Sequence, residues 1–507
     1  MRQELIIQGV PDRIKRDAWW LETISTPQQD HHPSTTSDGP LLSSIRMQHA
    51  IPVLAALITV ADWLFWKQPL GISVAVFALI LSAAIMVTKR ARPSRSEWIW
   101  VTGFTLLCNL PVAIDFQFLS VLFSLGGIIC LALWVIYGGK SSEGAAVRLA
   151  VRLPTVGAVL LIRDALLDTQ TVNINSGLRR HATSLLLPLI MGVVFLALLA
   201  SANPVLEDVI AELDPGYLFE WEFWMRVLFW GLCACLIWPY LNLSDPWLGP
   251  RVRQPVAPKA GPARSSFLIN PVSVRNSLLL FNLLFLVQTV MDLGILTGGV
   301  ALPEGMSYAS YAHRGAYPLV VTALLAGLFT LMTHTMIKTD TTLRVLVYLW
   351  LAQNVFLVVT AAFRLQLYVD AYALTHLRVA AFIWMALVMV GLVLTLLQIH
   401  RGQSRGWLLR RCFVATLVTL YACCFVNFAE IIARYNLRHG DLASRDGYYI
   451  CSLGADAYPA IHAYELEADQ DLCGRSMRYY LNQNRIDTWR EWGFRRWRIQ
   501  AYYQQHN

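Results

Sequence analysis

FQFLSVLFSLGGIICLALWVIYG, residues 116–138, contains no charged side chain. A helix needs about 20 mostly apolar residues to cross the hydrocarbon core of a bilayer, because each residue adds about 1.5 Å to its length. The stretch therefore predicts a membrane-spanning helix. The whole chain shares this character, since 56% of its 507 residues are hydrophobic and 15% are charged, whereas soluble domains carry about 25% charged residues.

Similar apolar blocks recur along the chain, and together they predict an all-α integral membrane protein with about eleven transmembrane helices. The expected spans are residues 49–66, 71–88, 97–113, 116–138, 184–202, 223–243, 275–297, 316–336, 342–363, 376–399 and 407–428. The third contains Asn109 and Pro111. It is either a kinked span or half of a re-entrant hairpin with the fourth.

Lysine and arginine concentrate in every second connection between these spans, as in the connections 89–95 and 401–411. The alternate connections nearly lack them, and the one that contains Glu207 and Glu222 is strongly acidic. Short cytoplasmic connections retain positive charge, so the pattern predicts a cytoplasmic N-terminus and an extracytoplasmic C-terminus, N-in/C-out. Topology thus accounts for the net charge of +8, and no nucleic-acid partner is expected.

The spans divide the chain into five regions. These are a polar, partly disordered cytoplasmic segment at 1–48, a four-helix membrane region at 49–138, a cytoplasmic loop with an interfacial helix at 139–183, a membrane domain of about seven helices at 184–436, and a small, mostly helical extracytoplasmic tail at 437–507. In the tail, Cys451 and Cys473 can form a disulfide if the compartment is oxidising, or stay reduced. The basic and aromatic end of the tail, Trp489 to Arg498, suits lipid headgroups.

Polar side chains gather near the predicted extracytoplasmic ends of several spans, where ionisable residues are costly and often functional. The candidate ligand-binding residues are Tyr308, Tyr311 and Arg314, then Arg364, Tyr368, Tyr372 and Arg378, then Asn427, Glu430, Arg434 and Asn436. Spacings of three and four place Asn427, Glu430 and Arg434 on one face of a helix. Arginine suits phosphate or carboxylate, because its guanidinium makes bidentate contacts with both.

The same residues also have a purely structural interpretation. Arg364 can pair with Asp370, and Glu430 with Arg434, so that each pair only anchors a helix end at the membrane interface. Asp62 and Asp292 are isolated acids near the outer ends of their spans. They are interpreted as solvated interface residues, with a proton-coupled role as the alternative.

Several of these blocks resemble a known family. They are Tyr308-Ala-x-Tyr311-Ala, Ala362-x-Arg364-Leu-x-Leu-Tyr368, Leu374-Thr-x-Leu-Arg378 and Ile432-Ala-Arg434-Tyr-Asn436. They are similar to the bacterial membrane family called domain of unknown function 4173, with its relative 4153, over roughly residues 190–460. The four N-terminal spans fall outside this match. The resemblance implies a multi-pass membrane protein without an assigned activity. The expected location is the cytoplasmic (inner) membrane of a bacterium.

No motif specifies a reaction. The chain lacks a phosphate-binding loop that ends in Gly-Lys-Ser or Gly-Lys-Thr, a His-Glu-x-x-His motif and a Gly-x-Ser-x-Gly motif, and no metal or cofactor is expected. The first hypothesis is a non-enzymatic, transporter-like or ligand-sensing envelope protein whose pocket takes an anionic lipid headgroup or a small anion. The alternatives are a transferase that acts on a lipid-linked donor with Glu430 as its base, and a structural subunit whose tail docks an envelope partner.

Overall fold

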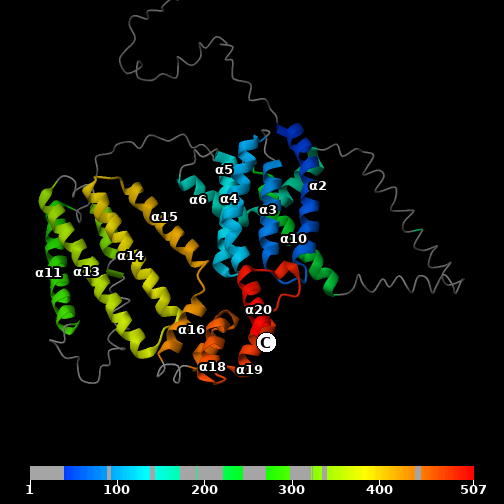
Figure 1. The fold of residues 1–507 in the computed structure, drawn as a ribbon. Helices are drawn as coiled ribbons and strands as arrows, with labels where there is room; N and C mark the ends of the chain where they lie inside the picture. The colour runs from blue at the N-terminus through cyan, green and yellow to red at the C-terminus, as the bar shows by residue number, and fades with distance from the viewer. Residues whose placement is uncertain are drawn as a thin grey trace, which may run out of the picture. The chain divides into compact units, whose positions relative to one another are not determined.

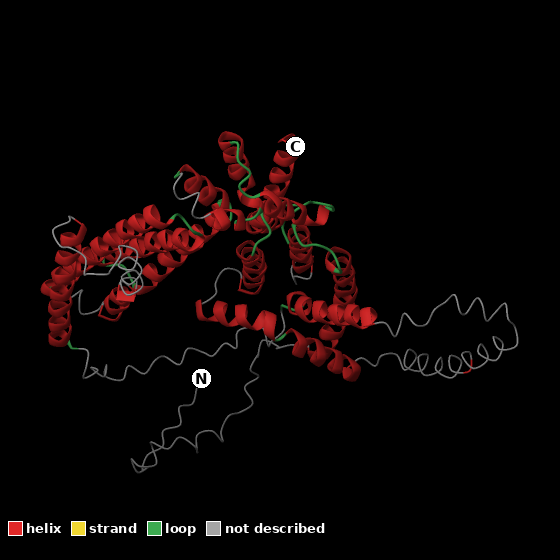
Figure 2. Cartoon of the chain, turned by 90° about the horizontal axis from the view of Figure 1, so that it is seen from below, coloured by secondary structure: helices red, strands yellow, loops and turns green. Residues whose placement is uncertain are grey.

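The computed structural model describes residues 39–87, 93–137, 143–171, 191, 221–243, 270–296, 321–322, 324–333, 340–439 and 447–506. Within these ranges the chain forms helices and loops and no strand (Figure 2). Two compact units can be distinguished. The first comprises Met1–Ala55 and Val159–Glu220, and the second comprises Ala56–Ala158 and Trp221–Asn507. All contacts discussed below lie within the second unit.

Seven helices of the described ranges are long and apolar enough to cross a membrane. They are α4 (Arg95–Ile114), α5 (Phe118–Tyr137), α10 (Trp221–Leu241), α11 (Pro271–Leu296), α13 (Thr341–Tyr372), α14 (His376–His400) and α15 (Arg405–Cys423) (Figure 1). The chain is therefore a multi-pass membrane protein. The apolar helices Ala50–Phe65, Ile72–Val87 and Leu324–Thr333 are shorter, and the expected span 184–202 lies outside the described residues.

Several helix ends differ from the expected ones. Helix α2 (Gly39–Phe65) begins before the expected residue 49, and α13 continues beyond residue 363 to Tyr372. Helix α15 ends at Cys423 rather than near 428, because Asn427 caps a new helix. In the loop 139–183, α6 (Glu143–Thr155) and α7 (Gly157–Thr171) replace the single expected interfacial helix.

Helix α4, which corresponds to the third expected span, is a single helix packed against α5. Its first turn is fixed by a capping box, in which the Ser94 side chain accepts from the Glu97 backbone and the Glu97 carboxylate accepts from Ser94 N–H. Asn109 is buried but satisfied, because it donates to the Thr105 carbonyl and accepts from Ser124 of α5 at 2.7 Å. This polar contact joins two helices that are each long enough to span.

A packed core of the membrane region lies where α11, α13 and α14 meet. Trp350 of α13 is buried there and stacks on Phe281 of α11 with ring centroids 5.1 Å apart. Asn282 of α11 donates to the Leu346 carbonyl of α13 at 3.0 Å, so the two helices also share a hydrogen bond. Much of the remaining surface of these helices exposes leucine and valine, as lipid contact requires.

The C-terminal part folds into a small helical body, here called the C-terminal cap. It comprises α16 (Phe428–Arg438), η3 (Ala455–Ala457), α18 (Tyr458–Ala468), α19 (Gly474–Gln483), η4 (Trp489–Glu491) and α20 (Phe494–His506). Ala433 of α16 shares its core with Ile461 and Met477. Helix α16 is therefore packed as part of the cap. Cys451 and Cys473 form a disulfide with Cα atoms 5.4 Å apart.

The cap contacts three span connections and the end of α15. Ile72 N–H, at the α2–α3 connection, donates to the Trp492 carbonyl at 3.0 Å. Asp115, between α4 and α5, pairs with Arg495, and Leu374, between α13 and α14, bonds to Asn436. These connections therefore lie at the same end of the helices, against the orange and red cap of Figure 1.

Gly71 makes this docking possible at the α2–α3 connection. A Cβ atom on Gly71 would lie 2.5 Å from the backbone carbonyl carbon of Glu491, closer than two such atoms can approach. We therefore expect Gly71→Ala to push η4 away and to raise the protease sensitivity of residues 489–506 several-fold. Gly103→Ala is the matched control, because a Cβ there meets nothing within 4 Å. Equal sensitivity of the two variants would contradict the docking.

Candidate functional site

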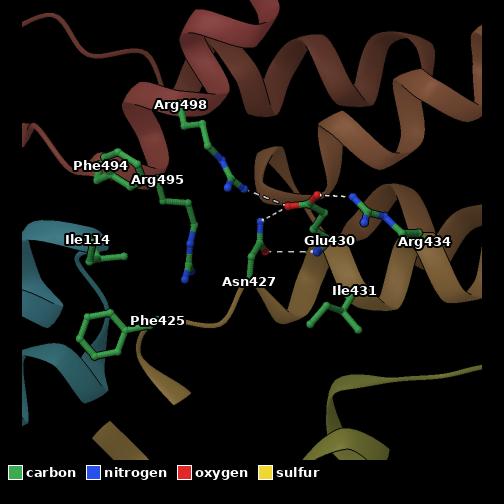
Figure 3. Close-up of a pocket in the computed structure, with 9 residues that line it drawn as sticks. All are labelled: Ile114, Phe425, Asn427, Glu430, Ile431, Arg434, Phe494, Arg495 and Arg498. Atoms are coloured by element: carbon green, nitrogen blue, oxygen red, sulfur yellow. Dashed lines mark hydrogen bonds and ion pairs between the residues drawn. The ribbon is translucent and has the colours of Figure 1, made fainter. Parts of the chain in front are cut away.

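A pocket of about 300 Å³ opens between the cap and the ends of α4 and α15. We call it the arginine pocket. It is lined by Ile114, Phe425, Asn427, Glu430, Ile431, Arg434, Phe494, Arg495 and Arg498 (Figure 3). Its residues come from the last turn of α4, the break between α15 and α16, α16 itself and α20, so that segments far apart in the sequence build it.

Helix α16 supplies the carboxylate of the pocket. The Asn427 side chain caps the helix by accepting from Glu430 N–H at 3.2 Å, and its amide nitrogen donates to Glu430 Oε2 and to the Asp456 carbonyl. Arg434, one turn further on, pairs with Glu430 Oε1 at 2.6 Å. The three side chains thus share a face of α16, and the Glu430–Arg434 pair of the structural interpretation is formed.

Helix α20 supplies two further guanidinium groups. Arg498 reaches Glu430 Oε2 at 3.0 Å, so that Arg434 and Arg498 approach one carboxylate from two sides (Figure 3). Arg495 is buried and pairs with Asp115 at 2.6 Å. It also donates to the carbonyls of Cys424 and Val426, which lie in the break after α15, where carbonyl groups lack intrahelical partners.

The electrostatic balance leaves positive charge at the mouth of the pocket. Arg495 is neutralised by Asp115, whereas Arg434 and Arg498 share the single carboxylate of Glu430. The side chains of Arg434 and Arg498 are 56% and 51% exposed. A guanidinium has five N–H donors, so both groups keep donors for an incoming anion. The pocket can therefore hold phosphate or carboxylate.

Asp456 lies behind Arg495, with 3.6 Å between Oδ2 and Nη1. Burial raises the pKa of Asp456 above the usual aspartate range, and the nearby Asp115 carboxylate raises it further against the opposing charges of Arg495 and Arg496. Asp456 is therefore easier to protonate in the folded protein than a free aspartate.

This raised pKa predicts a pH dependence with a definite sign. Because the folded state holds the Asp456 proton more tightly than the unfolded chain, Asp456 contributes stability that grows as the pH falls through its raised pKa. Asp456→Asn lacks this gain. At pH 7 we expect Asp456→Asn to be at least as stable as the parent. Below pH 7 the stability of the parent should increase progressively relative to that of the variant. Unfolding curves of both proteins in detergent at several pH values measure the difference in their stability. A difference that does not change with pH would contradict the prediction.

Arg364 lies away from the pocket, within the membrane region. It pairs with Asp292 of α11, and the two side chains are 6% and 0% exposed. Gln288 and Thr360 add hydrogen bonds to the Asp292 carboxylate. The expected partner, Asp370, instead accepts from Tyr435 and Gln366. Asp292 is thus not a solvated interface residue, because helix packing encloses it with a cation.

Most of the other predicted residues build the corner between α13 and α14. Arg378 donates to the Tyr372 and Ala373 carbonyls and stacks over the Tyr368 ring at 4.1 Å. Asn436 is fully buried and exchanges two hydrogen bonds with the Leu374 backbone, at 2.7 and 2.9 Å. These contacts hold a tight turn in which Ala373 has a φ of 66°. The polar groups of Arg378 and Asn436 therefore have a structural role in this turn.

Tyr308, Tyr311 and Arg314 lie outside the described residues. Asp62 was interpreted as solvated, yet it accepts from Arg226 and Trp230 of α10. No group of three or more His, Cys, Asp or Glu residues is placed to hold a metal ion in the described part of the chain.

The family is decided by comparison with family models. The model described as Domain of unknown function (DUF4153) matches residues 50–464. The chain belongs to this family. The DUF4153 match begins at the first apolar helix, so the expectation that the four N-terminal spans lie outside the family was wrong. Of the two related families that the sequence resembles, 4173 and 4153, the match supports DUF4153. No curated protein matches the chain, and no solved structure does.

The DUF4153 match includes the part of the pocket carried by α4, α15 and α16 and ends within α18, before α20. Arg495 and Arg498 therefore lie beyond the matched residues. Neither was predicted as a pocket residue, although the run 489–498 is basic and aromatic. The available signal was their spacing of three, which places both on one face of a helix.

Proposed function

We propose that the protein binds an anion through phosphate or carboxylate groups in the arginine pocket, as a transporter-like or ligand-sensing membrane protein rather than an enzyme. The anion is a lipid headgroup or a small solute. One observation carries the proposal: two exposed guanidinium groups, of Arg434 and Arg498, converge on one carboxylate beside an open cavity. Such a site has excess positive charge and spare donors, which is what anion recognition requires.

The pocket is assigned to the extracytoplasmic side of a bacterial cytoplasmic membrane. The basic connections 89–95 and 401–411 follow α3 and α14, at the ends of these helices opposite to the cap. Positive charge marks the cytoplasmic side. The Cys451–Cys473 disulfide in the cap supports this orientation, because disulfides persist in oxidising compartments.

The contacts of Glu430 favour a counter-ion role over a catalytic one. Its Oε1 accepts from Arg434, and its Oε2 accepts from Asn427 and Arg498. A general base needs a free lone pair within reach of the proton that it removes. Here three donors take three of the roughly four acceptor sites of the carboxylate, and the carboxylate keeps two arginines in position, which supports binding rather than transferase chemistry.

Binding of inorganic phosphate to the purified full-length protein in nonionic detergent tests the proposal. We expect Arg434→Gln and Arg498→Gln each to weaken phosphate binding about tenfold, because each removes a charge-assisted hydrogen bond. Arg478→Gln, an exposed arginine of α19 outside the pocket, should bind phosphate as the parent does. Isothermal titration measures the affinities. Equal affinities in all four proteins, or no binding by the parent, would contradict the proposed function.

A further inference from the structure

We propose that the natural occupant of the arginine pocket is an anionic phospholipid. Its phosphate group contacts Arg434 and Arg498, and its acyl chains lie along the exposed apolar surface of α15. This inference rests on the proposed function and deepens it, because it selects one ligand class from the two that anion binding allows. Four observations carry it.

The lining of the pocket is amphipathic. Besides the charged groups, the lining includes Ile114, Phe425, Ile431 and Phe494, and Figure 3 shows Ile114 and Phe425 on the other side of the hollow from Arg434. Phe425, Ile431 and Phe494 are each more than a third exposed. A small anion would leave these side chains in water, which the hydrophobic effect disfavours. A molecule with both an anionic and an apolar part covers both walls.

The pocket lies at the depth where lipid headgroups are found. Ile114 is the last residue of α4, and Phe425 follows the last turn of α15, so the pocket begins where two membrane-spanning helices end. The polar cap lies beyond it. A lipid whose headgroup occupies this position keeps its acyl chains in the hydrocarbon layer.

The apolar wall continues down α15 into the membrane. Val414, Leu417, Val418 and Leu420 of this helix are exposed, and among its described residues only Leu408 is buried by protein. Tyr421 holds the helix against α4 by donating to the Leu107 carbonyl at 2.7 Å. Lipid must cover such a face, so acyl chains are in place immediately below Phe425.

The size and charge of the pocket fit a phospholipid headgroup. A volume of about 300 Å³ lies at the lower end of the range of pockets that take small organic ligands, about 300–1,000 Å³, so the pocket has room for more than a bare phosphate. A phosphodiester carries one negative charge and offers oxygens to two guanidiniums, which matches the excess charge of Arg434 and Arg498 over Glu430. A zwitterionic choline headgroup would add a repelled cation.

The experiment compares three probes on the purified, delipidated full-length protein by native mass spectrometry from nonionic detergent. The probes are dihexanoyl phosphatidylglycerol, dihexanoyl phosphatidylcholine and glycerol 3-phosphate. We expect the phosphatidylglycerol to bind at least tenfold more tightly than either of the others. Arg434→Gln/Arg498→Gln should remove this preference, and Arg478→Gln should retain it.

A second variant pair tests the apolar wall. Ile431→Gln should weaken phosphatidylglycerol binding several-fold and leave glycerol 3-phosphate binding unchanged. The control Leu466→Gln, at an exposed leucine of α18, should change neither. If glycerol 3-phosphate binds as tightly as the phosphatidylglycerol, the site takes a small anion, and only the lipid inference fails. If none of the three probes binds, the inference and the proposed function fail together.

Discussion

Arg364→Met should lower the free energy of unfolding by about 3–5 kcal/mol, because it leaves a buried carboxylate without its cation. Asp292 is completely buried and its partner nearly so. Water cannot reach the orphaned charge, and a membrane environment makes such a charge costly. We expect this to be the largest effect of any single substitution considered for this chain.

Unfolding in mixed micelles with increasing sodium dodecyl sulfate measures this effect, and two further variants control it. Arg364→Met/Asp292→Leu removes both charges and should recover most of the lost stability, since a well-packed apolar pair often replaces a buried ion pair without loss. Gln366→Met, at an exposed position of the same helix, should cost less than about 1 kcal/mol. If Arg364→Met were as stable as the parent, the ion pair would contribute nothing to stability.

The double variant also separates structure from binding. Arg364 was a candidate ligand-binding residue on sequence grounds, but the arginine pocket does not include it. Arg364→Met/Asp292→Leu should therefore bind phosphate like the parent once its fold is recovered. Weakened phosphate binding in this stable double variant would show that Arg364 takes part in ligand binding.

Arg495→Gln should have the second largest effect, a loss of about 3 kcal/mol together with partial release of the cap. Arg495 pairs with Asp115 between α4 and α5 and donates to the Cys424 and Val426 carbonyls after α15. One buried side chain therefore joins the cap to two membrane segments. Glutamine keeps part of the hydrogen bonding but leaves the Asp115 carboxylate without a counter-charge.

Hydrogen–deuterium exchange of the full-length Arg495→Gln protein shows which residues lose stability. Faster exchange should appear in residues 484–506 and around residues 114–118, while the centre of α13 stays protected. Arg478→Gln on α19 serves as the matched control, because it removes an exposed arginine of the same cap. Uniformly faster exchange along the chain would mean that Arg495 supports the global fold, and unchanged exchange would mean that it does not hold the cap.

Much of the membrane architecture could be predicted because its cause is local. An apolar block of span length must form a helix in lipid, where each backbone group needs a partner within its own segment. Seven of the expected spans correspond to helices long enough to cross. The exact ends were less predictable. Helix α13 continues to Tyr372 because Asn436, from a distant segment, holds the turn that follows it.

The candidate site was predictable only where it lies on one helix. The shared face of Asn427, Glu430 and Arg434 follows from helical periodicity alone, and so does their mutual pairing. Arg498 could not be assigned to Glu430 in this way, since nothing local relates α20 to α16. Arg364 illustrates the same limit, because Asp370 was nearer in sequence than Asp292 and was wrongly preferred.

Span length and apolar composition act within single segments, so the amino-acid sequence is enough to predict a helical, multi-pass membrane protein. Which charges meet depends on tertiary packing, and the pairs are Asp292 with Arg364, Asp115 with Arg495, and Glu430 with Arg498. Each of these pairs joins segments that are far apart along the chain. Helix periodicity places a side chain on a face, but only packing between helices brings two such faces together.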